Sequence, residues 1–156
     1  MKIAVYPGSF DPITNGHIDI LKRSLEVFDK VILLLAVNPN KKSVFSVEKR
    51  LEIMKEATED LGNVEVDFTS GLTVEYCHKA QAKHIIRGLR AVTDFEYEFQ
   101  ICAANRYLAD DIDMVFFMSD SHNTFISSST INELAKNGAD ISKLVPPCVM
   151  EAYKQR

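Results

Sequence analysis

Short apolar runs alternate along the chain with longer segments in which apolar residues recur every three or four positions. The short runs are rich in β-branched residues, and several are apolar on successive residues, which is typical of strands covered on both faces of a sheet. They predict five strands, at Ile3–Tyr6, Val31–Val37, Val64–Phe68, His84–Ile86 and Met114–Met118.

The longer segments predict helices between these strands. The first helix has an apolar face formed by Ile18, Leu21, Leu25 and Phe28. The second is expected to begin after Ser46, a good N-cap residue, with an apolar stripe at Leu51, Met54 and Leu61. Two segments with capping-box spacing, Thr93-x-x-Glu96 and Thr130-x-x-Glu133, predict two more helix starts, the first helix running to about Leu108.

This alternation predicts an α/β fold with a five-stranded parallel sheet flanked by helices, joined by right-handed crossovers. The chain of 156 residues contains no linker, repeat or low-complexity stretch. We therefore expect one Rossmann-like, doubly wound domain over residues 1–156. Ligands of such sheets bind beyond the carboxyl ends of the strands, where the strand order reverses.

The predicted helix over 94–108 has two apolar stripes. Phe95, Phe99 and Cys102 lie on one, and Tyr97, Ile101, Ala104 and Leu108 lie on the other. A helix that is apolar on two sides is buried on two sides. Two interpretations remain open: the second stripe contacts another copy of the chain, or the helix is deeply sandwiched within a monomer.

Composition and charge limit the classes of partner and the cellular setting that we expect for this protein. The net charge of −4 gives no basic field for nucleic acid, so any phosphate site must be local. No apolar run reaches about 18 residues, and only four apolar residues separate Met1-Lys2 from Pro7, so we expect neither a membrane span nor a signal peptide, and a cytoplasmic setting. The three cysteines, without a CxxC pair, predict no disulfide framework and no protein metal site.

The loop after the first strand carries the strongest candidate chemistry. Residues 7–12 turn the chain, and Thr14-Asn15-Gly16-His17 opens the following helix. A helix N-terminus presents unpaired N–H groups and a positive dipole end, which suit a phosphate group. Neither a P-loop nor a GxGxxG pattern is present. His17, together with Ser9 and Thr14, is therefore a candidate site residue rather than an ordinary polar one.

Other loops at the same sheet edge add hydroxyl and basic side chains. Ser127-Ser128-Ser129-Thr130 supplies more hydroxyls than one N-cap needs. Arg87-Gly88-Leu89-Arg90 follows the fourth strand, and arginine forks suit phosphate oxygens. Lys41 and Lys42 follow the second strand. Basic residues gathered at one edge predict a polyanionic substrate.

These segments resemble a known enzyme family. Thr14-x-Gly16-His17 resembles the (H/T)xGH motif of the nucleotidyltransferase superfamily, and Ile126-Ser127-Ser128-Ser129-Thr130 resembles its ISSS-type motif. The long first segment, Lys41-Lys42, and the blocks at 87–92 and 94–98 together are similar to bacterial phosphopantetheine adenylyltransferases. The resemblance extends over essentially the whole chain.

The resemblance implies transfer of the adenylyl group of ATP to 4′-phosphopantetheine, giving dephospho-coenzyme A and pyrophosphate, the penultimate step of coenzyme A synthesis. It implies Mg²⁺ as cofactor, feedback by coenzyme A and a homohexamer. It assigns His17, as transition-state stabiliser, with Lys41 and Arg90 to catalysis, and Ser9, Lys41, Thr73 and Arg87 to phosphopantetheine. It assigns to ATP binding Ser9, Phe10, His17, Gly88, Leu89, Arg90, Glu98, Asn123, Thr124, Phe125, Ile126, Ser127, Ser128 and Ser129.

One segment departs from the family pattern. Members commonly carry a proline and an aromatic residue ahead of ISSS, where this chain has Ser119 to Asn123, so an aromatic contact near the adenine is not expected from Asn123. Two alternatives stay open at this stage. One is a related nucleotidyltransferase acting on nicotinate mononucleotide or glycerol 3-phosphate, and the other is a non-catalytic nucleotide-binding module.

Overall fold

The structure, a computed structural model, describes residues 1–120 and 126–156, apart from the side chains of Val92 and Thr93. Its five strands form one parallel sheet in the order β3-β2-β1-β4-β5. The strands are β1 (Ile3–Gly8), β2 (Lys30–Ala36), β3 (Val64–Thr69), β4 (His84–Leu89) and β5 (Asp113–Met118). All five predicted strands are confirmed, and the order reverses between β1 and β4.

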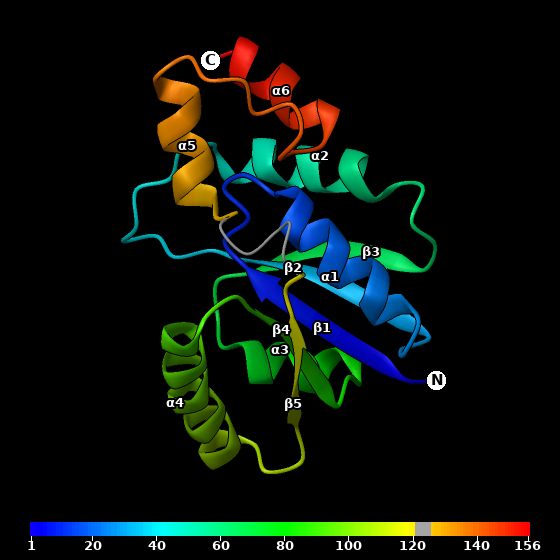
Figure 1. The fold of residues 1–156 in the computed structure, drawn as a ribbon. Helices are drawn as coiled ribbons and strands as arrows, with labels where there is room; N and C mark the ends of the chain where they lie inside the picture. The colour runs from blue at the N-terminus through cyan, green and yellow to red at the C-terminus, as the bar shows by residue number, and fades with distance from the viewer. Residues whose placement is uncertain (121–125) are drawn as a thin grey trace.

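Helices cover both faces of the sheet (Figure 1). The helices are α1 (Asn15–Leu25), α2 (Val47–Thr58), α3 (Thr73–Ala80), α4 (Val92–Leu108), α5 (Ser128–Lys136) and α6 (Pro147–Lys154). Figure 1 shows α1, α2, α5 and α6 on one side of the sheet, and α3 and α4 on the other. The α/β prediction with a five-stranded parallel sheet is confirmed. Among the helices that the structure describes, none is long and apolar enough to cross a membrane.

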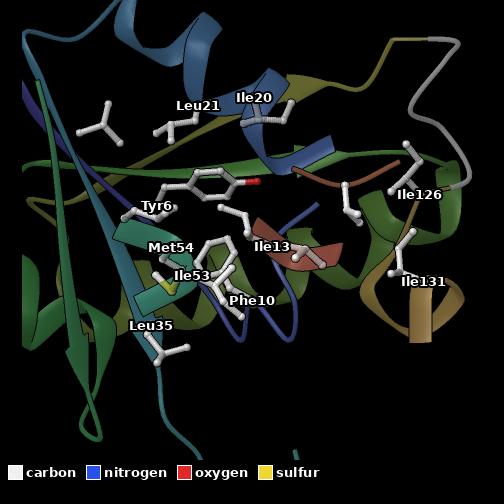
Figure 2. Close-up of a cluster of buried hydrophobic side chains, with 14 of the residues drawn as sticks. Tyr6, Phe10, Ile13, Ile20, Leu21, Leu35, Ile53, Met54, Ile126 and Ile131 are labelled. Carbon is white, nitrogen blue, oxygen red and sulfur yellow. The ribbon is translucent and has the colours of Figure 1, made fainter. Parts of the chain in front are cut away.

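The core has two parts because the central strands are apolar on both faces. Val31, Leu33 and Leu35 of β2 point into the larger cluster, while Ile32 and Leu34 point into the smaller cluster under α3. Figure 2 shows the larger cluster, in which side chains of β1, β2, α1, α2 and α5 meet Phe10 and Ile13 of the loop after β1. The loop that carries the candidate chemistry is thus anchored in the core.

The helix caps differ in part from those predicted. Ser46 caps α2 as expected, accepting a hydrogen bond from Lys49 N–H at 3.1 Å. The two predicted capping boxes are wrong. Helix α4 begins at Val92 after Ala91, so Thr93 lies inside its first turn. Helix α5 begins at Ser128, three residues earlier than the spacing predicted, and it is capped by Ser127, whose hydroxyl accepts a hydrogen bond from Thr130 N–H.

Helix α4 lies at one end of the sheet, against β4 and β5 (Figure 1). Much of its apolar surface is exposed. Phe95 is 50% exposed, Tyr97 and Phe99 are each 62% exposed, and Leu108 is 53% exposed. The interpretation of a deeply sandwiched helix within a monomer is therefore wrong. The other interpretation, contact with a further copy of the chain, stays a prediction.

Candidate active site

A cavity of about 400 Å³ opens at the carboxyl ends of β1 and β4, where the strand order reverses. Its walls come from the loop after β1, the first turn of α1, the end of β4, the start of α4 and the first turn of α5. Eleven of the residues predicted for the site line it: Ser9, Phe10, His17, Arg87, Gly88, Arg90, Glu98, Ile126, Ser127, Ser128 and Ser129. Topology thus brings together three stretches that are far apart in the sequence, within residues 6–20, 87–98 and 119–129.

A second cavity, of about 220 Å³, adjoins the first. It contains Lys41 and Lys42 from the loop after β2. Ser9, Ser128 and Ser129 line both cavities, so these three serines form a shared wall. The predicted residue Lys41 therefore lies next to the main cavity rather than inside it.

Some predicted residues lie elsewhere. Leu89 is 7% exposed and lines neither cavity, and its carbonyl accepts a hydrogen bond from Ser119 N–H at 2.8 Å. Thr73, the first residue of α3, is half-buried and also lines neither cavity. Asn123, Thr124 and Phe125 lie outside the described residues. Their assignments stay predictions.

The loop after β1 is held in place through its backbone. Four carbonyl oxygens, one at Pro7 near the end of β1 and three in the loop, accept hydrogen bonds from side chains of β4, α2 and α5. The pairs are Arg87 to Pro7 (3.1 Å), Arg50 to Ser9 (3.0 Å), Asn132 to Asp11 (2.9 Å) and Ser128 to Pro12 (2.7 Å). Backbone carbonyls in an irregular loop need such partners, and here the partners also fix where Ser9 lies.

The carboxylate of Asp11 joins this loop to the one that carries Lys41. Its two oxygens accept hydrogen bonds from the backbone N–H groups of Val44 (2.7 Å) and Phe45 (2.9 Å). Asp11 therefore links the loop after β1 to a wall of the second cavity, to which Val44 belongs. Gly8 leaves room for the ring of Phe10 in the same loop, because a Cβ atom at Gly8 would lie 3.0 Å from that ring.

His17 sits at the start of α1 in a reciprocal pair with Thr14. The Thr14 hydroxyl accepts from His17 N–H at 3.4 Å, and His17 Nδ1 accepts from Thr14 N–H at 3.0 Å. Because Nδ1 is an acceptor, the neutral ring carries its proton on Nε2. The ring of Phe10 packs edge-on against the imidazole, with the ring centroids 4.9 Å apart. His17 therefore presents a fixed N–H donor to the cavity that it lines.

The imidazole of His17 is neutral at physiological pH. Burial, and then the positive charges of Arg90 and Arg87, lower the pKa of His17 from 6.5 to about 4. A neutral ring at this position can donate a hydrogen bond to a phosphate oxygen but cannot act as a charged clamp. It is also not needed as a base when the attacking group is itself an anion.

Arg87 is already engaged in a bidentate ion pair with Glu98. The distances are 2.9 Å from Nε and 2.6 Å from Nη2 to the two carboxylate oxygens, and Glu98 is 5% exposed. Burial alone would lower the pKa of the Arg87 guanidinium, but the contact with Glu98 raises it above its usual value. A phosphate bound by Arg87 would use the N–H groups that Glu98 and Pro7 leave free.

Arg90 and the serines occupy the opposite wall. Arg90 pairs with Asp94 at 3.3 Å and donates to the Ile126 carbonyl at 3.3 Å. Ser127 caps α5 and Ser128 bonds to the loop after β1, so among the three serines only Ser129 has a hydroxyl without a hydrogen-bond partner in the described part of the chain. Fewer serine hydroxyls are therefore free to bind a ligand than the sequence predicts.

The carboxylates near the cavities offer no ready cage for a metal ion. Asp94 and Glu98 pair with arginines, and Asp11 accepts two N–H groups. Over residues 1–120 and 126–156, no group of three or more His, Cys, Asp or Glu side chains could hold a metal ion. A magnesium ion here would therefore enter with the phosphates of a nucleotide rather than be held by the protein alone.

Several residues that line the two cavities were not predicted from the sequence. Tyr6, on β1, is 5% exposed and lines the main cavity, and burial raises the pKa of its hydroxyl. Arg50, on α2, lines the second cavity. A signal for Arg50 existed: it precedes Ile53 and Met54 by three and four positions, which places its charge on the buried stripe of the helix.

We expect the His17 imidazole to titrate with a midpoint near pH 4, well below the 6.5 of an exposed histidine. The reason is burial beside two arginines. A pH titration of the imidazole carbon-bound protons by NMR, assigned by comparison with a His17→Gln variant, measures this midpoint. A midpoint at pH 6 or above would contradict the arrangement described for His17.

We also expect Arg87→Met to lower the free energy of unfolding by about 3–5 kcal/mol, since it leaves the Glu98 carboxylate buried without its partner. Urea denaturation measures the loss. In the double variant Arg87→Met/Glu98→Gln the buried charge is gone, and most of the stability should return. Equal losses in the single and double variants would show that the charge of Glu98 is not the cause.

Comparison with known proteins agrees with this geometry. Residues 5–134 match the family described as cytidylyltransferase-like. The chain is 51% identical over 156 residues to phosphopantetheine adenylyltransferase of Syntrophomonas wolfei, covering 100% of this chain and 97% of the relative. It is 52% identical to the phosphopantetheine adenylyltransferase of Roseiflexus sp., covering 99% and 97%.

Solved structures support the fold. One from Vibrio parahaemolyticus, described as a nicotinate-nucleotide adenylyltransferase, superimposes with a TM-score of 0.75 at 22% identity, covering 98% of this chain and 99% of that one. A lipopolysaccharide core biosynthesis protein of Thermoplasma volcanium gives a TM-score of 0.59 at 20% identity, covering 78% and 99%. The relatives at about 50% identity, which match along the whole chain, show that this chain belongs to the phosphopantetheine adenylyltransferase family.

Proposed function

We propose that this protein transfers the adenylyl group of ATP to 4′-phosphopantetheine, forming dephospho-coenzyme A and pyrophosphate, the penultimate step of coenzyme A synthesis. The observation that carries this proposal is the neutral His17 donor at the start of α1, in a cavity that also contains Arg87, Arg90 and the first turn of α5. Family membership supplies the substrate pair.

The reaction needs no protein nucleophile. A phosphate oxygen of phosphopantetheine attacks the α-phosphorus of ATP in line, the P–O bond to the β-phosphate breaks, and pyrophosphate leaves with the bonding electrons. The protein aligns the two anions and stabilises the charge that develops on the α-phosphate. His17 Nε2–H donates to an α-phosphate oxygen as a preorganised donor, because Thr14 and Phe10 hold the imidazole ring in place.

The remaining roles follow from the walls of the two cavities. Lys41, in the second cavity, and the free N–H groups of Arg87 hold the phosphate of phosphopantetheine, with Ser9 between the two substrates. The Ser129 hydroxyl and the N-terminus of α5, together with Arg90, hold the β- and γ-phosphates. Gly88 and Glu98, which line the main cavity, belong to the ATP side. Thr73 and Leu89 line neither cavity, and their assignments to the pantetheine arm and to ATP come instead from the family resemblance.

ATP enters as its magnesium complex in this proposal, since the carboxylates near the cavities are engaged elsewhere. Coenzyme A carries both the pantetheine and the adenine parts of the substrates, which supports its role as a feedback inhibitor at the same site. The outward-facing aromatic side chains of α4 support self-association, and we propose a homohexamer in a cytoplasmic setting.

The substrate assignment is tested by pyrophosphate release with ATP and one of three acceptors: 4′-phosphopantetheine, nicotinate mononucleotide or glycerol 3-phosphate. We expect release with phosphopantetheine alone, because only that acceptor matches the family of the close relatives. Omitting the acceptor controls for ATP hydrolysis. Release with another acceptor and none with phosphopantetheine would refute the proposal.

The role of His17 is tested by His17→Ala. We expect turnover to fall by roughly 10²–10³, the usual cost of losing one preorganised donor, while the Kd for ATP changes little. Steady-state kinetics and calorimetry measure the two quantities. His78→Ala, which removes an exposed imidazole from α3, is the matched control and should leave turnover unchanged. Turnover near the wild-type value in His17→Ala would remove His17 from the mechanism.

A further inference from the structure

Arg50 is a buried cation without an ionic partner. It lies on α2 and is 6% exposed. Its Nη1 donates to the Ser9 carbonyl at 3.0 Å, and its Nε is buried without a hydrogen-bond partner in the described part of the chain. No carboxylate of the described residues forms an ion pair with it. Its positive charge is therefore offset only by one carbonyl dipole.

Such a side chain is costly unless something compensates it. A guanidinium taken out of water loses its hydration, and buried charges in proteins are normally paired and hydrogen-bonded. The polar contact to Ser9 satisfies one of its five donors. An anion that binds next to the guanidinium would supply the negative charge and the hydrogen-bond acceptors that the protein does not provide.

The second cavity provides the place for that anion. Arg50 lines it together with Lys41 and Lys42, and Asp11 is the one carboxylate among the lining residues. Both oxygens of Asp11 already accept backbone N–H groups. Three cations thus surround a cavity of about 220 Å³ with a single, engaged anion. The first turn of α5, at Ser128 and Ser129, adds its positive end to the same wall.

We propose that Arg50 is a substrate-binding residue: its guanidinium, with Lys41, binds a phosphate group in the second cavity. This rests on the proposed function, in which that phosphate belongs either to phosphopantetheine or to the departing pyrophosphate. A planar guanidinium offers two parallel N–H donors to a phosphate, which a lysine cannot do. Because the same side chain holds the Ser9 carbonyl, phosphate binding also stiffens the wall that both cavities share.

Binding measurements without turnover test the proposal. Calorimetry of the full-length protein measures the Kd of phosphopantetheine in the absence of ATP, and of pyrophosphate and ATP separately, in wild type, Arg50→Met and Arg50→Lys. The charge control is Lys55→Met, which removes an exposed cation from the last turn of α2, outside both cavities. Thermal unfolding without ligand is recorded for each variant.

We expect Arg50→Met to raise the Kd of phosphopantetheine or of pyrophosphate at least tenfold, with a smaller rise in Arg50→Lys and none in Lys55→Met. The ligand that loses affinity identifies the source of the phosphate. The Tm of ligand-free Arg50→Met should stay close to that of wild type, because removal of an uncompensated buried charge offsets the loss of the hydrogen bond to the Ser9 carbonyl. Unchanged Kd values for both ligands would overturn the proposal. So would a lowered ligand-free Tm with equal losses for all ligands, which is the behaviour of a merely structural residue.

A second measurement is made on the wild-type protein, and a variant is needed only to assign the signal. In the ¹H–¹⁵N spectrum of wild-type protein, the Nε–H signal of Arg50 should shift on addition of inorganic phosphate, with the signal assigned by its absence in Arg50→Lys. An Arg50 signal that stays in place at saturating phosphopantetheine and pyrophosphate would overturn the proposal. Normal pyrophosphate release by Arg50→Met would refute it while leaving the proposed function intact. Phosphate binding at Arg50 in a wild-type protein that releases no pyrophosphate would support the role of Arg50 and refute the proposed function.

Discussion

The two cavities depend on how one segment, formed by the end of β1 and the loop over residues 9–14, is held in place. Side chains from β4, α2 and α5 donate hydrogen bonds to four of its carbonyl oxygens, and the Asp11 carboxylate connects it to the loop after β2. These contacts join positions up to 121 residues apart in the sequence. They fix the segment relative to the three elements that contact it, and the alignment of two substrates requires such a fixed wall.

The sequence was sufficient to predict the sheet and most of the cavity. Strands such as β2 are apolar on both faces, and that pattern has few explanations other than a covered parallel sheet. Ser9, His17, Arg87 and the serines before α5 follow strands, so the topology alone brings them to one edge. The motif resemblance then gave these residues chemical roles that their spacing could not.

What could not be predicted are contacts between distant side chains. Arg87 pairs with Glu98, and the Ser128 hydroxyl donates to the Pro12 carbonyl, so fewer of their hydrogen-bond donors are free to bind a ligand. No local sequence pattern shows either contact. The helix starts at α4 and α5 were misplaced for a related reason, since several residues near each start can serve as a cap. The burial of Arg50 was not predicted, although its spacing from Ile53 and Met54 places it on the buried stripe of α2.

The serine wall shared by the two cavities has a consequence for inhibitor chemistry. A compound that fills only one cavity leaves the other open, whereas a compound with one arm in each would make its second contact intramolecularly. The gain from such a link depends on the length of the tether, and because the two cavities share a wall at Ser9, Ser128 and Ser129, the tether can be short. The geometry of this protein favours two-armed ligands over single-pocket ones.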